Sequence, residues 1–392
     1  MLFESLLADR TRLMSANAIR EILKVVARPG MISLAGGIPS PDSFPMDIIR
    51  ELGDRILRKY GSSAFQYDRT EGFMPLCEAL SVWLQKKGIH ADSDAIRITT
   101  GSQGALLQLG MILLSKGDAV AVEAPTYLGA LTAFNPFEPR YLRVDTDEDG
   151  MVPESLDRLL ERERVKFIYL IPNFQNPTGR TLSGERRRTL AEIIVRRGAL
   201  LVEDDPYGDL RYRGQSLPTV KSLAPDHVVY CGSLSKIFAP GLRIGYVVAP
   251  EPVRRWMVLA KQGIDLHTST CTQALAAEYI SGGFLEKHLP EIMRIYRPKQ
   301  EAMLHALDRY MPKTCRWNKP DGGMFIWVEG PAGLDTEKLY RKAVERGVAF
   351  VPGKFFFTEP GEGNETMRLN YTMSDTQTLD KAVRLLAGVL SE

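Results

Sequence analysis

Short apolar runs alternate with stretches of helical periodicity between about residues 94 and 250 of the chain. Apolar runs bounded by turn residues are typical of strands, and their alternation with helices favours a mostly parallel sheet covered on both faces. The pattern predicts seven strands, at 95–99, 118–123, 140–144, 166–171, 199–204, 228–232 and 245–249. It also predicts helices, among them 104–114 and 185–197. The expected fold class is therefore α/β.

From about residue 284 the pattern changes to that of a smaller α+β unit with its own sheet. The elements expected there are a helix, a strand, a helix and a strand before a final helix, at 286–310, 323–328, 336–346 and 367–371. The start of the chain contains a predicted helix at 17–27 and a loop rich in Gly and Pro. We expect three parts: an N-terminal segment that packs on the small domain and the active site, a large domain and a small domain, at 1–45, 46–283 and 284–392.

Composition and charge remove several classes of protein. The chain has 392 residues, enough for two domains, and its 50 Lys and Arg nearly balance 48 Asp and Glu. Without a broad basic field, nucleic acid is not an expected partner. The four cysteines show no CxxC spacing and no neighbouring His, so we expect reduced thiols rather than disulfides or a metal site.

The apolar pattern also bears on location. Charged residues interrupt the first twelve positions, and no run approaches about 20 apolar residues, so we expect neither a signal peptide nor a membrane span. A cytoplasmic protein is expected. The triple arginine 186–188 is expected on a solvated face of its helix.

Lys236 follows the sixth predicted strand, where ligands bind in sheets of this kind. Ser233, Ser235 and Arg243 surround it in sequence, and two hydroxyls and a guanidinium suit a phosphate. A lysine beside a bound phosphate suits a Schiff base with pyridoxal 5'-phosphate (PLP), in which a desolvated amine attacks a carbonyl. The alternative is a solvent-exposed lysine in a Ser/Gly loop.

Asp204 ends the fifth predicted strand. The ring nitrogen of PLP must stay protonated to take up electrons, and a buried carboxylate stabilises that cation. Tyr207 and Asn176 could both bind the phenolic oxygen of the same ring. Asp204 and Asn176 also have structural interpretations. Asp204 could be a turn aspartate, and the sequence Asn-Pro-Thr-Gly that starts at Asn176 is typical of a turn.

Ser102, Gln103 and Gly104 lie between the first predicted strand and an apolar helix. Such a loop places backbone amides of a helix N-terminus where a phosphate could bind. Tyr127 follows the next strand and could stack on a pyridine ring, although a core or surface tyrosine is an equal alternative. Arg368 sits among apolar residues of a predicted strand, where an arginine is costly unless paired. It could hold a substrate α-carboxylate or form an interdomain salt bridge.

Taken together, these motifs resemble fold-type-I PLP-dependent aminotransferases of class I/II, over essentially the whole chain. The resemblance implies that Lys236 forms the Schiff base, that Asp204 pairs with the pyridinium, and that Tyr127 stacks on the ring. Tyr207 and Asn176 would bind the phenolic oxygen. The residues implied for the phosphate are Ser102, Gln103, Gly104, Ser233, Ser235 and Arg243.

The resemblance also implies how substrate and partner are held. Arg368 would bind the substrate α-carboxylate, helped by the backbone of Gly37 and by Asn176. Tyr67 matches a tyrosine that this family sends from one subunit to the phosphate of the other, which implies a homodimer with shared active sites. Lys236 would carry the proton during transfer of an amino group from an amino acid to a 2-oxo acid by a ping-pong scheme.

Within the family, the sequences around 19–21, 31–39 and 203–207 are most similar to the branch of 2-aminoadipate and kynurenine/aminoadipate aminotransferases. In that branch Arg20 would meet a substrate side-chain carboxylate, with an ordinary exposed arginine as the alternative. The implied substrates are 2-aminoadipate, glutamate and 2-oxoglutarate. The apolar residues Phe355, Phe356 and Phe357 leave room for a broader range that includes aromatic and branched-chain amino acids.

Three other functions share parts of this pattern. A β-lyase or a decarboxylase could use the same lysine and arginine. A PLP-binding transcription regulator would need a DNA-binding domain, whereas the residues before the phosphate loop read as the family's N-terminus. A dinucleotide-binding oxidoreductase would need GxGxxG after its first strand, and that motif does not occur there.

Overall fold

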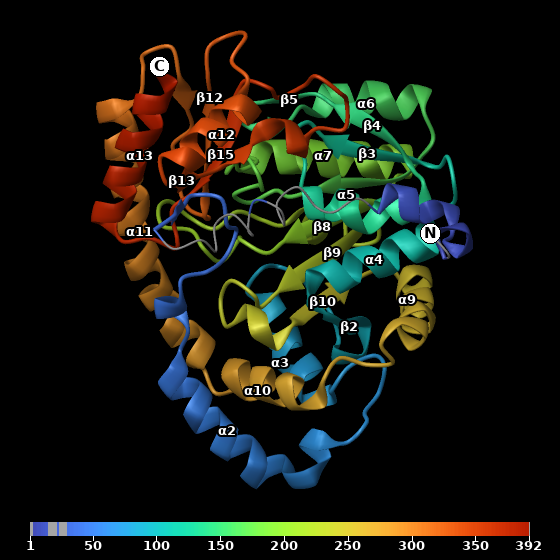
Figure 1. Cartoon of the computed structure of the whole chain (residues 1–392). Coiled ribbons are helices and arrows are strands. Elements are labelled where there is room, and N and C mark those ends of the chain that lie inside the picture. The colour runs from blue at the N-terminus through green and yellow to red at the C-terminus, as the bar shows by residue number, and fades with distance from the viewer. Residues whose placement is uncertain (1–2, 15–21, 23–29, 392) are drawn as a thin grey trace.

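The computed structural model describes residues 3–14, 22 and 30–391 of the chain (Figure 1). The helix expected at 17–27 lies outside these residues, except for Ile22. None of the helices in the described part of the chain is both long and apolar enough to span a membrane.

A seven-stranded sheet forms the centre of the molecule, in the order β2-β10-β9-β8-β7-β3-β4. Its strands are β2 (Ile96–Thr100), β3 (Ala119–Glu123), β4 (Arg140–Val144), β7 (Val165–Leu170), β8 (Leu201–Asp205), β9 (Val228–Ser233) and β10 (Ile244–Val248). All neighbours are parallel except that β10 runs antiparallel to both β2 and β9. The predicted strands are confirmed, with ends that move by at most two residues.

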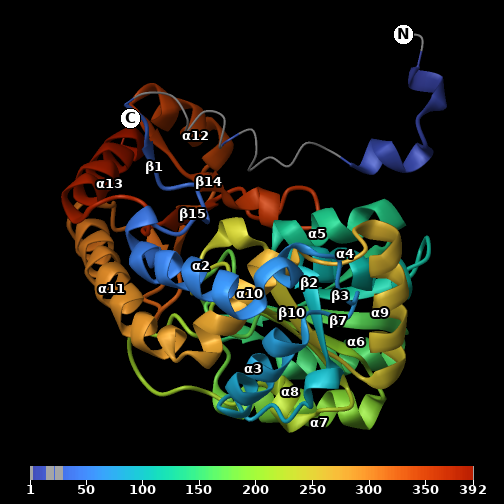
Figure 2. The same cartoon turned by 90° about the horizontal axis from the view of Figure 1, so that it is seen from below.

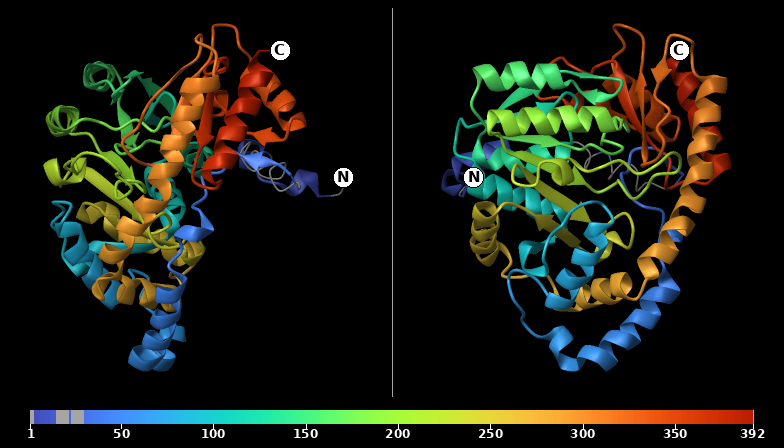
Figure 3. Two further views of the ribbon diagram at one scale, coloured as in Figure 1. Left: turned by 90° about the vertical axis from the view of Figure 1, so that its left-hand side faces the viewer. Right: turned by 180° about the vertical axis from the view of Figure 1, so that it is seen from behind.

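Helices cover both faces of this sheet because side chains alternate along each strand. Val120 and Val122 of β3 join the core formed with α4 (Gly101–Leu113) and α5 (Leu128–Phe134). Ala121, between them, joins the core on the other face. The helices of that second face are α6 (Pro153–Arg162), α7 (Gly184–Arg197) and α8 (Val220–Leu223), and Figure 3 shows α6 and α7 there. Helix α3 (Met74–Gln85) lies on this side as well, beside α7 and α8 in Figure 2.

Helix α7 corrects one expectation. It starts after Ser183, whose hydroxyl accepts from the backbone N–H of Arg186, and it ends at Gly198 in the left-handed region. Arg188 is exposed, as expected, but Arg187 is 0 % exposed and Arg186 pairs with Asp147. The prediction that all three arginines face solvent was therefore wrong.

The C-terminal part forms a second, antiparallel sheet of four strands, in the order β11-β12-β15-β14. Its strands are β11 (Arg316–Trp317), β12 (Phe325–Glu329), β14 (Val351–Pro352) and β15 (Thr366–Asn370). Its helices are α11 (Phe284–Tyr310), α12 (Thr336–Glu345) and α13 (Thr376–Leu390). The long helix α11 packs against α13 and reaches down to α10 (Thr270–Ser281) along one side of the molecule (Figure 3).

The chain start joins this smaller sheet region. Strand β1 (Ile32–Ser33) pairs in parallel with β13 (Val348–Ala349), and Figure 2 shows β1 beside β14 and α13. Helix α2 (Met46–Tyr60) then leads away to the lower end of the molecule in Figure 1, where it packs against α10. The remaining elements are α9 (Glu251–Ile264), the hairpin β5 (Thr146–Asp147) and β6 (Gly150–Met151), and short 3-10 turns, of which η4 (Gly61–Phe65) and η8 (Gly353–Phe356) matter below.

Candidate active site

A cavity of about 290 Å³ lies where the two sheets meet, at the carboxyl ends of β7, β8 and β9. The predicted residues that line it are Gly37, Ser102, Gln103, Tyr127, Asn176, Asp204, Tyr207, Ser233, Ser235, Lys236, Arg243 and Arg368. Its other lining residues are Ile38, Gly129, Ile171 and Pro206. Larger grooves exist on the surface, but this cavity is the place where the predicted chemistry converges.

Lys236 reaches the cavity from the loop after β9. Its Nζ donates to the backbone oxygen of Gly37 at 2.8 Å, so it is held between the two sheets. Burial, and then the cations of Arg243 and Arg368, lower the pKa of Lys236 to about 8. Roughly a tenth of such an amine is unprotonated at pH 7, and the unprotonated form is the nucleophile.

Asp204 is buried at the end of β8 and carries one unsatisfied oxygen. Its Oδ2 accepts from the hydroxyl of Tyr169 at 2.8 Å, while the buried Oδ1 has no hydrogen-bond partner among the described residues. Burial raises the pKa of Asp204 to about 7, and the neighbouring Asp205 adds to this while Tyr169 opposes it. A buried carboxylate of this kind is stabilised by a cationic N–H donor.

Asn176, Tyr207 and Arg368 form a connected set among the lining residues. Asn176 Nδ2 donates to the Tyr207 hydroxyl at 3.4 Å, and Arg368 Nη1 donates to Asn176 Oδ1 at 2.7 Å. The three side chains therefore fix one another across the junction between β15 and the large sheet.

Arg368 is 1 % exposed, and no carboxylate in the described part of the chain pairs with it. Its Nη2 donates to the backbone oxygen of Ala35 at 2.6 Å, and its guanidinium lies over the rings of Phe325 and Phe356 at 4.4 and 5.1 Å. Burial lowers its pKa only to about 10, so the arginine stays charged. Arg368 is thus a cation at the cavity without a matching anion, and it does not form the interdomain salt bridge that was the alternative interpretation.

The other end of the cavity is built for an anion. Helix α4 begins there at Gly101, whose φ of +70° favours glycine. A Cβ at this position would lie 2.3 Å from Arg243 Nη2, so glycine also lets the guanidinium approach the helix N-terminus. Strand β10 brings the two loops together, because Gly245 pairs with Thr99 on one side and Ser233 on the other. Backbone amides, hydroxyls and a guanidinium at one point are typical of a phosphate site.

Two predicted residues, Gly104 and Tyr67, do not line the cavity, and the position of a third is not described. Gly104 lies in the first turn of α4 but does not line the cavity. Tyr67 is 77 % exposed and its ring touches His267 edge-on. Arg20 lies outside the described residues.

The sequence also left some contributors unidentified. Tyr169 was missed, although it pairs with Val202, two residues before Asp204, so that Tyr169 and Asp204 lie on the same face of the sheet. Phe325, which flanks Arg368, was also missed, whereas Phe356, which flanks it too, was expected near the site as one of three apolar residues. Phe356 is fully buried, and neither Phe355 nor Phe357 is among the lining residues.

The residues present fit PLP. The unsatisfied Asp204 Oδ1 suits a ring N–H, the amine of Lys236 suits an aldehyde, and the α4 terminus beside Arg243 suits a phosphate. In the described part of the chain no cluster of His, Cys, Asp and Glu is arranged to hold a metal ion.

Comparison with known proteins agrees with this geometry. Residues 29–386 match the family described as aminotransferase class I and II. An aromatic-amino-acid aminotransferase from Thermococcus litoralis is 41% identical, over 100% of this chain and 95% of its own. A kynurenine aminotransferase from Pyrococcus horikoshii, solved with PMP, superposes with a TM-score of 0.95 at 44% identity, over 99% of this chain and 97% of its own.

An α-aminoadipate aminotransferase from Thermus thermophilus, complexed with N-(5'-phosphopyridoxyl)-L-leucine, has a TM-score of 0.92 and 41% identity, over 99% of this chain and 98% of its own. The chain therefore belongs to the class I and II aminotransferase family, with the fold-type-I architecture. It is a PLP-dependent aminotransferase, whose substrates are amino acids and 2-oxo acids. The predicted family, fold, enzyme class and cofactor are confirmed.

Proposed function

We propose that this enzyme transfers the amino group of 2-aminoadipate, glutamate or an aromatic or branched-chain L-amino acid to a 2-oxo acid such as 2-oxoglutarate. The observation that carries the proposal is the cavity in which Lys236, an unsatisfied Asp204 oxygen and the unpaired Arg368 cation converge. Relatives named for aromatic amino acids, kynurenine and α-aminoadipate support this range.

The cofactor's role and the residues that would hold it can be stated separately. PLP, when bound, supplies an electron sink for the bonds at the substrate α-carbon. Asp204 Oδ1 would accept from its ring N–H, and Asn176 and Tyr207 would bind its ring oxygen, with Tyr127 against the ring face. The residues proposed for its phosphate are Ser102, Gln103, Gly104, Ser233, Ser235 and Arg243. Gln103 would act through its backbone, because its side-chain amide already donates to the carbonyl of Gly129.

Lys236 Nζ is proposed as both the attachment point and the base. Its lowered pKa lets it accept and return a proton near neutral pH. Because the amine is tethered at the cavity floor and directed by the Gly37 carbonyl, it moves that proton without the entropy cost of a free base.

Arg368 is proposed to bind the substrate α-carboxylate, with Gly37 and Asn176 beside it. A fork of N–H donors that is already oriented by Asn176 and Ala35 suits a bidentate carboxylate. Contact between Arg20 and a substrate side-chain carboxylate stays a prediction. Replacing Arg20 with alanine should raise the KM for 2-oxoglutarate, and an unchanged KM would contradict that role.

We also propose a homodimer with shared active sites. Large apolar side chains are exposed on α2 and beside η4, among them Met46, Leu57, Phe65 and Tyr67, and covering them with a second copy would remove that surface from water. Tyr67 would then reach the partner's phosphate site.

The domain division at 1–45, 46–283 and 284–392 is proposed too, with the β1–β13 ladder supporting the attachment of the first segment to the small domain. A cytoplasmic location is proposed because the four cysteines, all within the described residues, are unpaired.

The test is a panel of amino acids mixed with the cofactor-loaded enzyme. Each half-reaction is followed by the visible absorbance of the cofactor, and turnover is then measured with 2-oxoglutarate. Amino acids of the proposed types should give both signals. Release of CO₂ or ammonia without any need for a 2-oxo acid would instead indicate a lyase or decarboxylase.

A further inference from the structure

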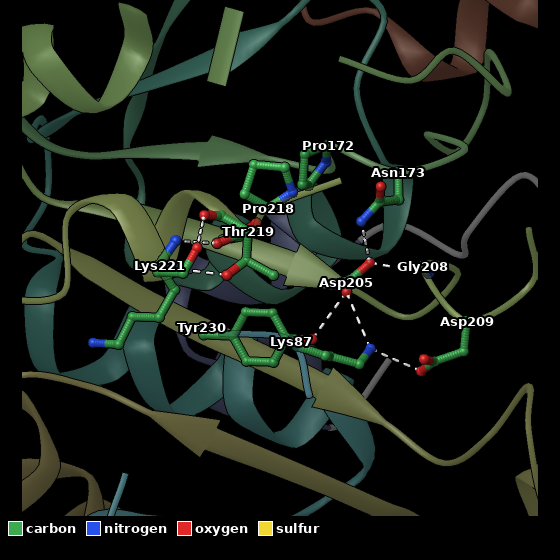
Figure 4. A network of polar contacts seen from close by, with 12 residues as sticks. Lys87, Pro172, Asn173, Asp205, Gly208, Asp209, Pro218, Thr219, Lys221 and Tyr230 are labelled. Carbon is green, nitrogen blue, oxygen red and sulfur yellow. Dashed lines mark hydrogen bonds and ion pairs between the residues drawn. The ribbon is translucent and has the colours of Figure 1, made fainter. Parts of the chain in front are cut away.

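A second buried polar network lies behind the cavity, on the other face of β8 (Figure 4). Asp204 and Asp205 are consecutive in the strand, so their side chains point to opposite faces. Asp204 faces the cavity, whereas Asp205 is turned toward the end of α3 and the loop at 206–209. The family resemblance gave no role to Asp205.

Asp205 joins segments that are far apart in the sequence. Its Oδ1 accepts from Asn173 Nδ2 at 2.8 Å and from the backbone N–H of Gly208 at 3.0 Å, and its Oδ2 accepts from the Tyr230 hydroxyl at 2.9 Å. Lys87 Nζ lies 3.6 Å from Oδ2. A Cβ at 208 would come 2.5 Å from Oδ1, so glycine is what lets this turn close over the carboxylate.

The carboxylate is held in its charged form by these partners. Burial alone would raise its pKa, but Lys87, Asn173 and Tyr230 together lower the pKa of Asp205 below its usual range. The hydrogen bonds to the turn and to Asn173 are therefore charge-assisted, and such bonds are about twice as strong as neutral ones.

Arg187 extends the network to the loop that carries Asn176. Its Nη2 donates to the carbonyl of Pro172 at 3.0 Å and to Asn173 Oδ1 at 2.7 Å. It also donates to the carbonyls of Leu182 and Pro218, both at 3.0 Å. Asn173 is thus clamped between Arg187 on its oxygen and Asp205 on its nitrogen.

The two segments tied together by the Asn173–Asp205 bond are the ones that meet again in the cavity. Three residues after Asn173 comes Asn176, and two residues after Asp205 comes Tyr207, and these two side chains bond at 3.4 Å. The Asn173–Asp205 bond fixes the distance between these two segments on one side of the sheet. That distance in turn decides how closely Asn176 and Tyr207 approach each other in the cavity.

We propose that Asp205 is a positioning residue that, through Asn173 and Gly208, fixes Asn176 and Tyr207 at the cofactor ring. This inference rests on the proposed roles of Asn176 and Tyr207. Asp205 does not touch the cavity, so it acts only through the residues it holds.

The test compares Asp205→Asn with Asp209→Asn in the full-length enzyme. Both aspartates contact Lys87, at 3.6 and 2.8 Å, but Asp209 bonds neither Asn173 nor the Gly208 backbone, as far as the described contacts go. Three quantities are measured: the dissociation constant for added PLP, the visible circular dichroism band of the bound cofactor, and the thermal midpoint of the cofactor-free chain. The circular dichroism band reports the orientation of the ring, which a merely structural role would not change.

We expect Asp205→Asn to weaken PLP binding by at least about tenfold, as for loss of a charge-assisted hydrogen bond, and to change the dichroism band. Asp209→Asn should stay within about twofold of the parent. Asn173→Ala, which cuts the same link from the other side, should reproduce the dichroism change, and its combination with Asp205→Asn should add little further loss of affinity. If Asp205→Asn does not fold, Asn173→Ala carries the test alone.

Unchanged PLP affinity and dichroism in Asp205→Asn or Asn173→Ala, with only a lower thermal midpoint, would overturn the inference. Failure of the proposed function is a different result, because the parent enzyme and Asp209→Asn would then bind PLP but would not transfer an amino group to a 2-oxo acid.

Discussion

Arg368 gives the sharpest prediction about substrate binding. Replacing it with lysine keeps one charge but loses the fork and at least one of the bonds to Asn176 and Ala35. A hydrogen bond to a charged group contributes about 1.5–3 kcal/mol, so one lost bond to the carboxylate should cost about 2 kcal/mol, or roughly 30-fold in kcat/KM. Arg368→Gln removes the charge as well and should cost about 4 kcal/mol, or roughly 1000-fold.

The assay compares an amino acid with the amine that lacks its α-carboxylate, in the half-reaction followed by cofactor absorbance. The losses should fall on the amino acid and leave the poor rate of the amine nearly unchanged. Arg180→Lys is the matched control, because Arg180 pairs with Glu329 outside the cavity, at 3.4 Å, and should change kcat/KM by less than about threefold. Equal losses for the amino acid and the amine would refute the proposed role of Arg368, since the arginine would then not bind the substrate α-carboxylate.

Three further predictions follow from other buried groups. Asp204→Asn keeps the shape but removes the anion, so kcat/KM should fall by about 100-fold or more, whereas Tyr169→Phe, which removes only the bond to Oδ2, should cost about tenfold; equal effects would contradict the charge argument. The rate of PLP attachment to the cofactor-free enzyme should rise with pH around a midpoint of about 8, because the pKa of Lys236 is lowered to about 8 and only its unprotonated amine reacts; a midpoint near 10.5 would show that the lysine is not desolvated. Arg187→Met should lower the free energy of unfolding, measured by urea denaturation, by about 3 kcal/mol or more, because buried carbonyls lose their donor. Arg188→Met, on the exposed side of α7, should change it by less than about 0.5 kcal/mol. Equal effects of the two variants would contradict the burial of Arg187.

The apolar alternation was enough to predict the large sheet, because its strands, except the edge strand β4, are largely buried on both faces and bounded by turn residues. The direction of β10 was not predicted, although a clue was present. Parallel neighbours need a crossover of a dozen residues or more, and only 234–243 separate β9 from β10. The connection is too short for a helix that returns the chain, so the antiparallel direction could have been inferred.

The cavity was more predictable than the structure that supports it. Lys236, Asp204 and Arg243 lie next to strand ends, and the sequence alone shows both this position and the chemistry of their side chains. The burial of Arg187 was not visible, because its acceptors at 172, 182 and 218 come together only in the folded chain. The same reason hid the Asp205 network, since Lys87, Asn173 and Tyr230 lie in three separate segments.

The proposed chemistry depends most on a covalent bond between Lys236 and the cofactor aldehyde. The direct measurement is reduction of the PLP-loaded enzyme with borohydride, followed by mass spectrometry of its peptides, with Lys236→Ala treated in parallel. We expect the mass of the reduced cofactor on the peptide that contains Lys236, and no adduct in the variant, which should still bind PLP through the phosphate site. Attachment at another lysine, or equal labelling in Lys236→Ala, would contradict this expectation.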